Sequence, residues 1–228
     1  PIYLDENIIS QPAAALQLVA KEIFRMSDQV RDILKKTIEL VKNEEVKSID
    51  GLKENGEQVE RLGKCITEYL AALFSSGSLT EQQAAQTASL MCVLSDVERM
   101  GTLSVEMAEC MLERSDRKYK YTPEAMDELQ KSLKVLNKMF CDSLKALQGD
   151  DGIEPGKMMK RKDKLLDLDI KMRKAHIERV NKGKCKASLT APFTNILHLI
   201  DRMGNSCINL ADVAESGTSM KYFMLEEK

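Results

Sequence analysis

The chain has 228 residues, of which 43% are hydrophobic and 31% are charged, so it can form both a core and a solvated surface. This composition excludes a disordered chain, and a net charge of −2 argues against a dedicated nucleic-acid-binding protein. Aromatic residues are scarce and Trp is absent, whereas the helix-favouring Met occurs 13 times. Because no run of about 18 apolar residues occurs, we expect a soluble segment that does not itself cross a membrane.

Three helices are predicted in the first half. Apolar residues spaced alternately by three and four positions over residues 16–40 predict the first helix, with Ser10 as its N-cap. A second helix is predicted roughly over residues 43–74 and ends at a Ser- and Gly-rich stretch. The third begins with a capping box at Thr80 and continues to about residue 115.

Three more helices are predicted in the second half. Thr122, followed by Pro and Glu, is a strong helix start, and the apolar seam behind it covers residues 126–147. A Gly- and Asp-rich break separates it from a fifth helix over about 154–181, and the sixth is predicted over 190–215. The fold class is therefore all-α.

The two halves resemble each other in sequence. Residues 94–109 read LSDVERMGTLSVEMAE and residues 197–212 read LHLIDRMGNSCINLAD, with Leu, Arg, Met, Gly and a late Ala at a constant offset. Both segments fall in the third helix of their half, which favours a duplication. We predict one domain over 1–228 made of two tandem three-helix units, at about 10–117 and 122–216.

The repeated segments carry polar side chains at helical spacing. Glu98 and Thr102 are four residues apart and share one helix face, as do Asp201 and Asn205. Each pair encloses a Gly in the helix interior, which costs up to about 1 kcal/mol relative to Ala. Close approach of another helix or of a ligand is the usual reason for such a Gly.

The fifth predicted helix also carries a pair of acids on one face, Asp163 and Asp167. Two carboxylates so placed repel each other, and a hard cation would reverse this repulsion. If the fifth and sixth helices pack side by side, one oxygen-rich groove would contain Asp163, Asp167, Asp201 and Asn205. The alternative is that these acids simply face solvent.

The sequence gives no support to a catalytic site. No glycine-rich phosphate loop occurs. A carboxylate-bridged di-iron enzyme needs Glu-x-x-His on its helices, but Arg173 precedes His176 at that spacing and Asn195 precedes His198. We therefore predict no catalytic and no cofactor-binding residue, and interpret His176 as a packing or hydrogen-bonding residue.

Other charged and thiol groups are given structural interpretations. Arg99 and Arg202 recur in both halves and are predicted to form buried ion pairs, with phosphate contact as the alternative. The basic run over 157–164 is interpreted as a solvated helix face, with contact to a membrane surface as the alternative. The six Cys show no CxxC spacing, which favours scattered, mostly buried thiols of a reduced compartment.

These motifs resemble a known family. The segments ERMG at 98–101 and DRMG at 201–204, the latter followed by NLAD, resemble the ERIGD…NIAE signature of PhoU-like proteins, and Asp163-x-x-x-Asp167 is similar to their companion acidic motif. A second similarity lies at residues 176–185, HIERVNKGKC, which resembles the HIxRLxxGxC segment of one PhoU subgroup. That subgroup is the cytosolic C-terminal domain of bacterial sodium/phosphate cotransporter family proteins.

The resemblance implies a flat six-helix bundle of two tandem three-helix units, no catalysis, and a regulatory role in phosphate uptake. It also implies clusters of divalent metal or iron on the acidic faces of several members. Carried over to this chain, the metal-ligand set is Asp163, Asp167, Asp201, Asn205 and Glu98. Thr102 and Asn205 replace acids of the family pattern, so we expect an empty or weak site in the first half.

The leading hypothesis is a cytosolic regulatory domain at the cytoplasmic face of the cell membrane. Its partner would be the membrane-spanning sodium/phosphate cotransporter domain of the same polypeptide, and the start of the chain at Pro1 rather than Met fits a domain excised after that part. The alternative is a free-standing helical-bundle interaction protein or a metal-binding phosphate-signalling regulator. A homodimer stays open.

Overall fold

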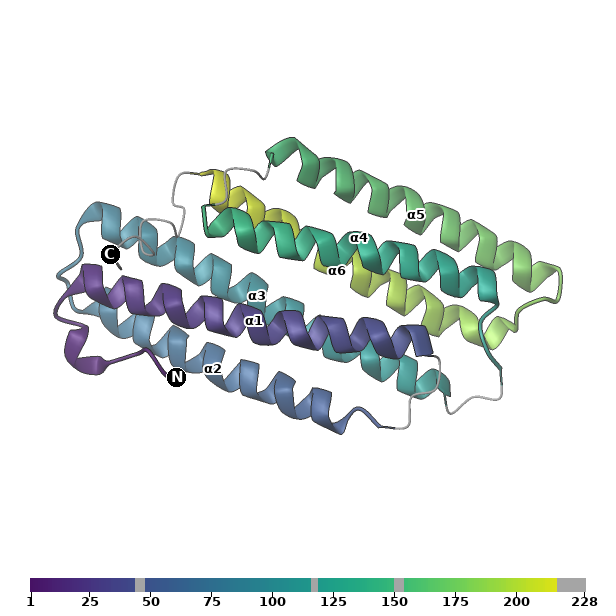
Figure 1. Ribbon diagram of the computed structural model, residues 1–228, viewed down its shortest axis with the longest axis horizontal. Helices are drawn as coiled ribbons and strands as arrows, with labels where there is room; N and C mark the ends of the chain where they lie inside the picture. The colour runs from purple at the N-terminus through teal and green to yellow at the C-terminus, as the bar shows by residue number, and fades with distance from the viewer. Residues whose placement is uncertain (44–47, 116–118, 150–153, 217–228) are drawn as a thin grey trace.

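The computed structural model describes residues 1–43, 48–115, 119–149 and 154–216, and in these ranges the regular structure is entirely helical (Figure 1). The long helices have the following bounds: α1 Pro12–Asn43, α2 Asp50–Ser75, α3 Glu81–Ser115, α4 Pro123–Leu147, α5 Pro155–Asn181 and α6 Thr190–Glu215. Two short 3-10 turns, η1 at Glu6–Ile8 and η2 at Ala187–Leu189, precede α1 and α6. The all-α prediction is confirmed.

The helix ends follow local side-chain chemistry. The capping box before α3 is formed as predicted, because the Gln83 N–H donates to Thr80 Oγ1 at 3.2 Å and the Thr80 N–H donates to Gln83 Oε1 at 3.0 Å. At the start of α4, the Ala125 N–H donates to Thr122 Oγ1 at 3.3 Å. Two expectations were wrong. The first concerns Ser10: because α1 begins at Pro12, Ser10 does not stand at its N-cap position.

The second wrong expectation concerns α2, which begins at Asp50 rather than near residue 43. The earlier residues 41–43 still belong to α1, where Val41 is fully buried. The first helix therefore extends to the residue at which the second was expected to begin. Residues 44–47 between the two helices lie outside the described part of the chain.

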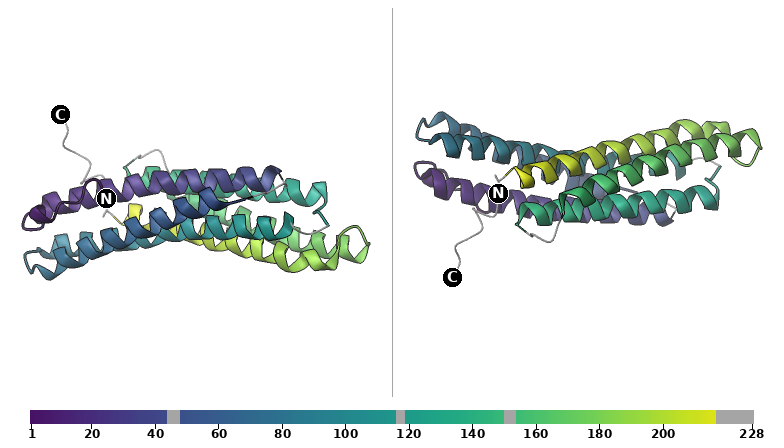
Figure 2. Two further views of the ribbon diagram at one scale, coloured as in Figure 1. Left: turned by 90° about the horizontal axis from the view of Figure 1, so that it is seen from below. Right: turned by 90° about the horizontal axis from the view of Figure 1, so that it is seen from above.

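The helices pack side by side in an elongated bundle (Figures 1 and 2). α1, α2 and α3 contact one another, as do α4, α5 and α6, and the two groups meet where α3 packs on α6 and α1 packs on α4. α2 and α5 lie on opposite outer edges of the view in Figure 1. The predicted repeat boundaries at 10–117 and 122–216 stay predictions.

The core runs along the central helices. It is rich in Leu, Ile and Met, and each fully buried Leu or Ile adds roughly 1.5–3 kcal/mol relative to exposure. The buried Met residues are Met26, Met100, Met107, Met111, Met126, Met139, Met158, Met172 and Met203. Among the described helices, none combines the length and the hydropathy needed to cross a membrane.

A buried carboxylate fastens the segment that precedes α1. Glu22 is fully buried, accepts the backbone N–H groups of Ile2 and Tyr3 at 2.9 and 2.7 Å, and pairs with Arg25. The pKa of Glu22 lies below its ordinary value, because these bonds outweigh the opposing effect of burial. The hydroxyl of Tyr69 on α2 donates to the Asp5 carbonyl at 2.8 Å, so the segment is tied to two helices.

Candidate functional site

The two repeated segments lie on α3 and α6, the helices through which the two halves meet. Their glycines permit close helix packing, as expected. A Cβ on Gly101 would lie 3.3 Å from Val30 of α1, and one on Gly204 would lie 3.2 Å from Leu165 of α5. The space beside each Gly is thus filled by another helix.

In the second half, Asp201 forms an ion pair with a lysine of the protein itself. The ammonium of Lys162 on α5 donates to Asp201 Oδ1 at 2.5 Å and to the Asp201 carbonyl at 3.2 Å. Half of the Asp201 side chain is exposed, but only 17% of Lys162 is. Lys162 also lies 3.3 Å from the position of a Cβ on Gly204, so the Gly makes room for the ammonium.

The other predicted ligands of this half point elsewhere. Asp163, Asp167 and Asn205 are exposed, and α5 and α6 are in contact as expected. Within the described residues, however, no three His, Cys, Asp or Glu side chains lie close enough together to hold a metal ion. In this arrangement the Lys162 ammonium neutralises Asp201. The metal site stays a prediction.

In the first half, the side chain of Glu98 lies directly over Gly63 of α2. A Cβ on Gly63 would lie 2.4 Å from Glu98 Oε1, so only Gly leaves room for this carboxylate. Burial raises the pKa of Glu98 above its ordinary value, and the neighbouring Glu60 raises it further. Thr102 donates its hydroxyl to the Glu98 carbonyl at 3.2 Å.

A shallow pocket of about 280 Å³ adjoins Glu98 between α2 and α3. Half of its lining residues are acidic, and one internal ion pair joins Lys53 to Glu109 at 2.9 Å. The lining consists of Lys53, Gly56, Glu57, Glu60, Thr102, Val105, Glu106 and Glu109. This face therefore has an excess of negative charge at the position where a neutral Thr102 stands in place of the family acid.

The recurring arginines are not buried. Arg202 on α6 is 56% exposed and lies 3.8 Å from Glu106 on α3, which is a surface ion pair of small energetic value. Arg99 is exposed as well. The prediction of buried ion pairs is wrong, because both side chains leave the helix on its solvent side.

His176 is a packing residue, as interpreted. It is buried, stacks on Phe193 with ring centroids 4.7 Å apart, and places Nε2 3.0 Å from Thr190 Oγ1. Burial lowers the pKa of His176, and the nearby Arg179 lowers it further, so the ring stays neutral near pH 7. These contacts join α5 to the start of α6.

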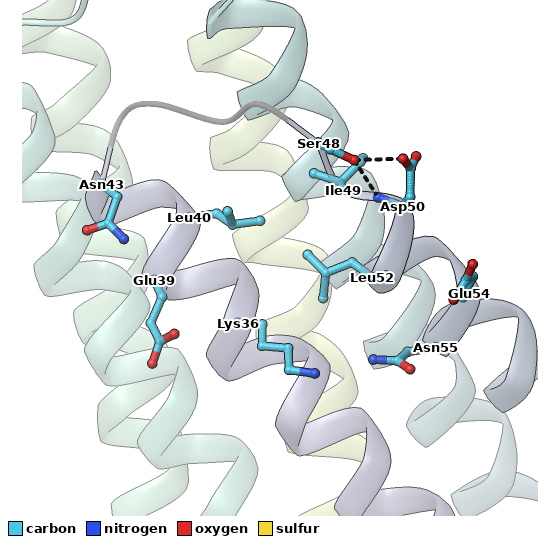
Figure 3. Close-up of a pocket in the computed structure, with 11 residues that line it drawn as sticks. Lys36, Glu39, Leu40, Asn43, Ser48, Ile49, Asp50, Leu52, Glu54 and Asn55 are labelled. Atoms are coloured by element: carbon cyan, nitrogen blue, oxygen red, sulfur yellow. Dashed lines mark hydrogen bonds between the residues drawn. The ribbon is translucent and has the colours of Figure 1, made fainter.

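A second hollow lies near the same end of α2, where α1 ends and α2 begins (Figure 3). It measures about 540 Å³ and mixes both signs of charge. Ser48 donates to Asp50 Oδ2 at 2.7 Å and receives the Asp50 N–H at 3.2 Å, which fixes the first turn of α2. We assign this hollow no function.

The basic run over 157–164 is only partly solvated. Lys157, Lys160 and Lys164 are exposed, but Arg161 bonds the buried Asp142 of α4 at 2.5 Å and Lys162 bonds α6. Sequence reasoning missed both bonds. Residues 161 and 162 flank the core position Leu165 on the helix wheel, and this is the signal that could have separated them from the exposed lysines.

The thiols are less buried than expected. All six Cys are free, but only Cys185 and Cys207 are buried, and Cys92 is exposed. The remaining three are half-buried, and Cys141 among them lies between α4 and α5. The prediction of mostly buried thiols is therefore wrong.

Comparison with known proteins supports the resemblance. The PhoU domain family model matches residues 23–111, which run from within α1 to near the end of α3. The phosphate-specific transport system accessory protein PhoU homolog 1 of Thermotoga maritima is 24% identical over 209 residues, which are 90% of this chain and 88% of that protein. The crystal structure of PhoU from Pseudomonas aeruginosa has a TM-score of 0.78, with 13% identity, over 86% of this chain and 93% of that chain. That last similarity confirms the PhoU-type fold.

Proposed function

We propose that this chain is a PhoU-type regulator of phosphate transport that works by binding partners and not by catalysis. The observation that carries the proposal is the PhoU domain match over residues 23–111, together with a relative named as a phosphate transport accessory protein that aligns with 90% of the chain. The neutral, packed state of His176 and the surface ion pairs of the motif helices agree with a binding role.

A free-standing accessory protein is the form that the similarities favour, because the Thermotoga maritima relative carries that description and this chain spans 88% of it. Attachment to a sodium/phosphate cotransporter domain is a second proposal. It rests on the HIERVNKGKC segment at residues 176–185 alone. In both forms the protein would act at the cytoplasmic face of the membrane, beside a transporter.

The exposed acids on α5 are the part of the predicted site that a partner can reach. Asp163 and Asp167 are both exposed and lie one helical turn apart on α5, the helix at an outer edge of the bundle (Figure 1). Neither acid is needed for packing, so both can be reversed in charge without a cavity or a lost internal bond. A partner that recognises this face would be repelled by the change.

The test is expression in a bacterium that lacks its own PhoU protein, with uptake of radiolabelled phosphate measured at high external phosphate. We expect the chain to lower uptake, and the double variant Asp163→Lys/Asp167→Lys to lose this effect. The matched control is Asp32→Lys/Glu39→Lys on the exposed side of α1, which makes the same charge change. Unchanged uptake with well-folded, expressed wild-type protein would refute the proposed function.

A further inference from the structure

An apolar cleft with a basic rim lies between α4 and α5, away from both motif faces. It measures about 680 Å³, within the range of small-molecule sites. Its lining alternates cations with apolar groups: Lys131, Lys134, Val135, Asn137, Lys138, Cys141, Arg161, Lys164 and Leu168. α5 forms the outer wall and lies at the edge of the bundle (Figure 1).

The floor of the cleft is apolar. Val135 and Leu168 are partly buried against the hydrophobic core, and the half-buried Cys141 lines the same cleft. The lysines add to this floor because their methylene stems lie along apolar surface while their ammonium groups reach water. A ligand in the cleft would therefore rest an apolar body on the floor and meet charge only at the rim.

The rim carries more positive charge than its neighbours neutralise. Lys131 pairs with Asp127 at 2.7 Å, and the single carboxylate of Asp142 serves both Lys138 and Arg161. Lys134 and Lys164 are exposed and have no carboxylate partner within the described residues. The two walls, α4 and α5, thus each present one uncompensated ammonium.

A polar group of the lining is also left unsatisfied. The side-chain oxygen Oδ1 of Asn137 is buried and has no hydrogen-bond partner within the described part of the chain. A buried acceptor without a donor is energetically unfavourable. A ligand that offers an N–H or O–H group to this acceptor would remove that cost.

We propose that the α4–α5 cleft binds a small amphiphilic organic anion, independently of the proposed transport regulation. The ligand has an aliphatic or aromatic body that covers Val135 and Leu168, and a phosphate or carboxylate group that bridges Lys134 and Lys164. Charge-assisted bonds from two ammonium groups give the selectivity for anions, and the floor rejects inorganic ions that have no apolar body.

The test uses alkylation of Cys141 by iodoacetamide, followed by mass spectrometry of the peptides. Two ligands are added in separate experiments: dodecyl phosphate, below its micelle concentration, has an aliphatic body, and adenosine monophosphate has an aromatic one. The ligand that slows alkylation of Cys141 shows which kind of body the cleft binds. Inorganic phosphate at equal ionic strength should not protect. The exposed Cys92 on α3 is the internal control and should react at the same rate throughout.

The variant Lys134→Glu/Lys164→Glu should weaken protection at least about tenfold, because it replaces two attractions by two repulsions. The control Lys35→Glu/Lys42→Glu changes two exposed lysines of α1 and should protect like wild type. Failure of both organic ligands to protect Cys141 would overturn the proposal. Equal protection in both double variants would also overturn it, since binding would then not use the rim.

Discussion

Replacement of Asp142 by Asn tests how α5 is held on α4. The Asp142 side chain is 3% exposed and accepts Lys138 Nζ from its own helix at 2.8 Å and Arg161 Nη1 from α5 at 2.5 Å. Asn keeps the shape but removes the charge that both cations share. The substitution therefore isolates the electrostatic part of the α4–α5 contact.

The expected cost follows from how the two cations are placed. Loss of one member of a fully buried ion pair costs about 3–5 kcal/mol, because the remaining charge is stranded. Here Lys138 is 58% exposed and Arg161 is 23% exposed, so both can turn to water. We expect instead about 1.5–3 kcal/mol, the range for hydrogen bonds to charged groups. For a chain of this size that lowers Tm by roughly 3 to 12 °C.

Thermal and urea unfolding at several pH values provide the assay. The pKa of Asp142 lies below its ordinary value of 3.8, because the bonds from Lys138 and Arg161 outweigh the opposing effect of burial. A lowered pKa adds stability that is fully present above the unfolded pKa and is lost as pH falls through the folded pKa. The difference from wild type should thus be constant from neutral pH to above 3.8 and shrink below it.

The control is Asp127→Asn, which removes an exposed pair with Lys131 on the same helix. It should cost much less than Asp142→Asn, because water solvates both exposed partners. If Asp142→Asn were no more costly than this control, or if its cost grew as pH fell below 3.8, the electrostatic account of the α4–α5 contact would be wrong.

Three further results are expected. Burial, and to a smaller extent Glu60, raise the pKa of Glu98, so the free energy of unfolding should fall as pH rises through that pKa. The variant Glu98→Gln should lack this fall when urea unfolding is measured from pH 4 to 8. Gly63→Ala should turn the flexible Glu98 carboxylate toward water and remove the burial that raises its pKa; an unchanged fall of stability with pH in the same urea assay would contradict this. Burial raises the pKa of the Cys207 thiol, so iodoacetamide at pH 8 should label the exposed Cys92 and leave Cys207 unmodified until the protein unfolds.

The helices were largely predictable because their signals are local. The apolar seams and the capping residues Thr80 and Thr122 involve neighbours within one or two turns, and the structure forms both caps. The start of α2 was not predictable in this way. No capping side chain marks it, since Ile49 stands at the N-cap position and makes no side-chain cap bond.

The candidate site was less predictable because its partners are distant in sequence. Spacing correctly places Glu98 with Thr102 and Asp201 with Asn205 on their helices, but it cannot show which side chain of another helix fills the space beside them. Lys162 reaches Asp201 from 39 positions away, and its position beside Asp163 made it look like one more solvated lysine. The buried Glu22 was equally invisible, since backbone N–H groups that satisfy a carboxylate leave no trace in the sequence.

The length of the central helices separates the two ends of the molecule. α3 has 35 residues, so at a rise of 1.5 Å per residue it spans about 50 Å. The turn between α2 and α3 and the turn between α5 and α6 lie at opposite ends of the long axis (Figure 1). Two partners can therefore dock at the two ends together without touching. Because the two ends are several Debye lengths apart, the charges of two such partners are screened from each other. Any coupling between the partners must therefore come from a displacement of the helices.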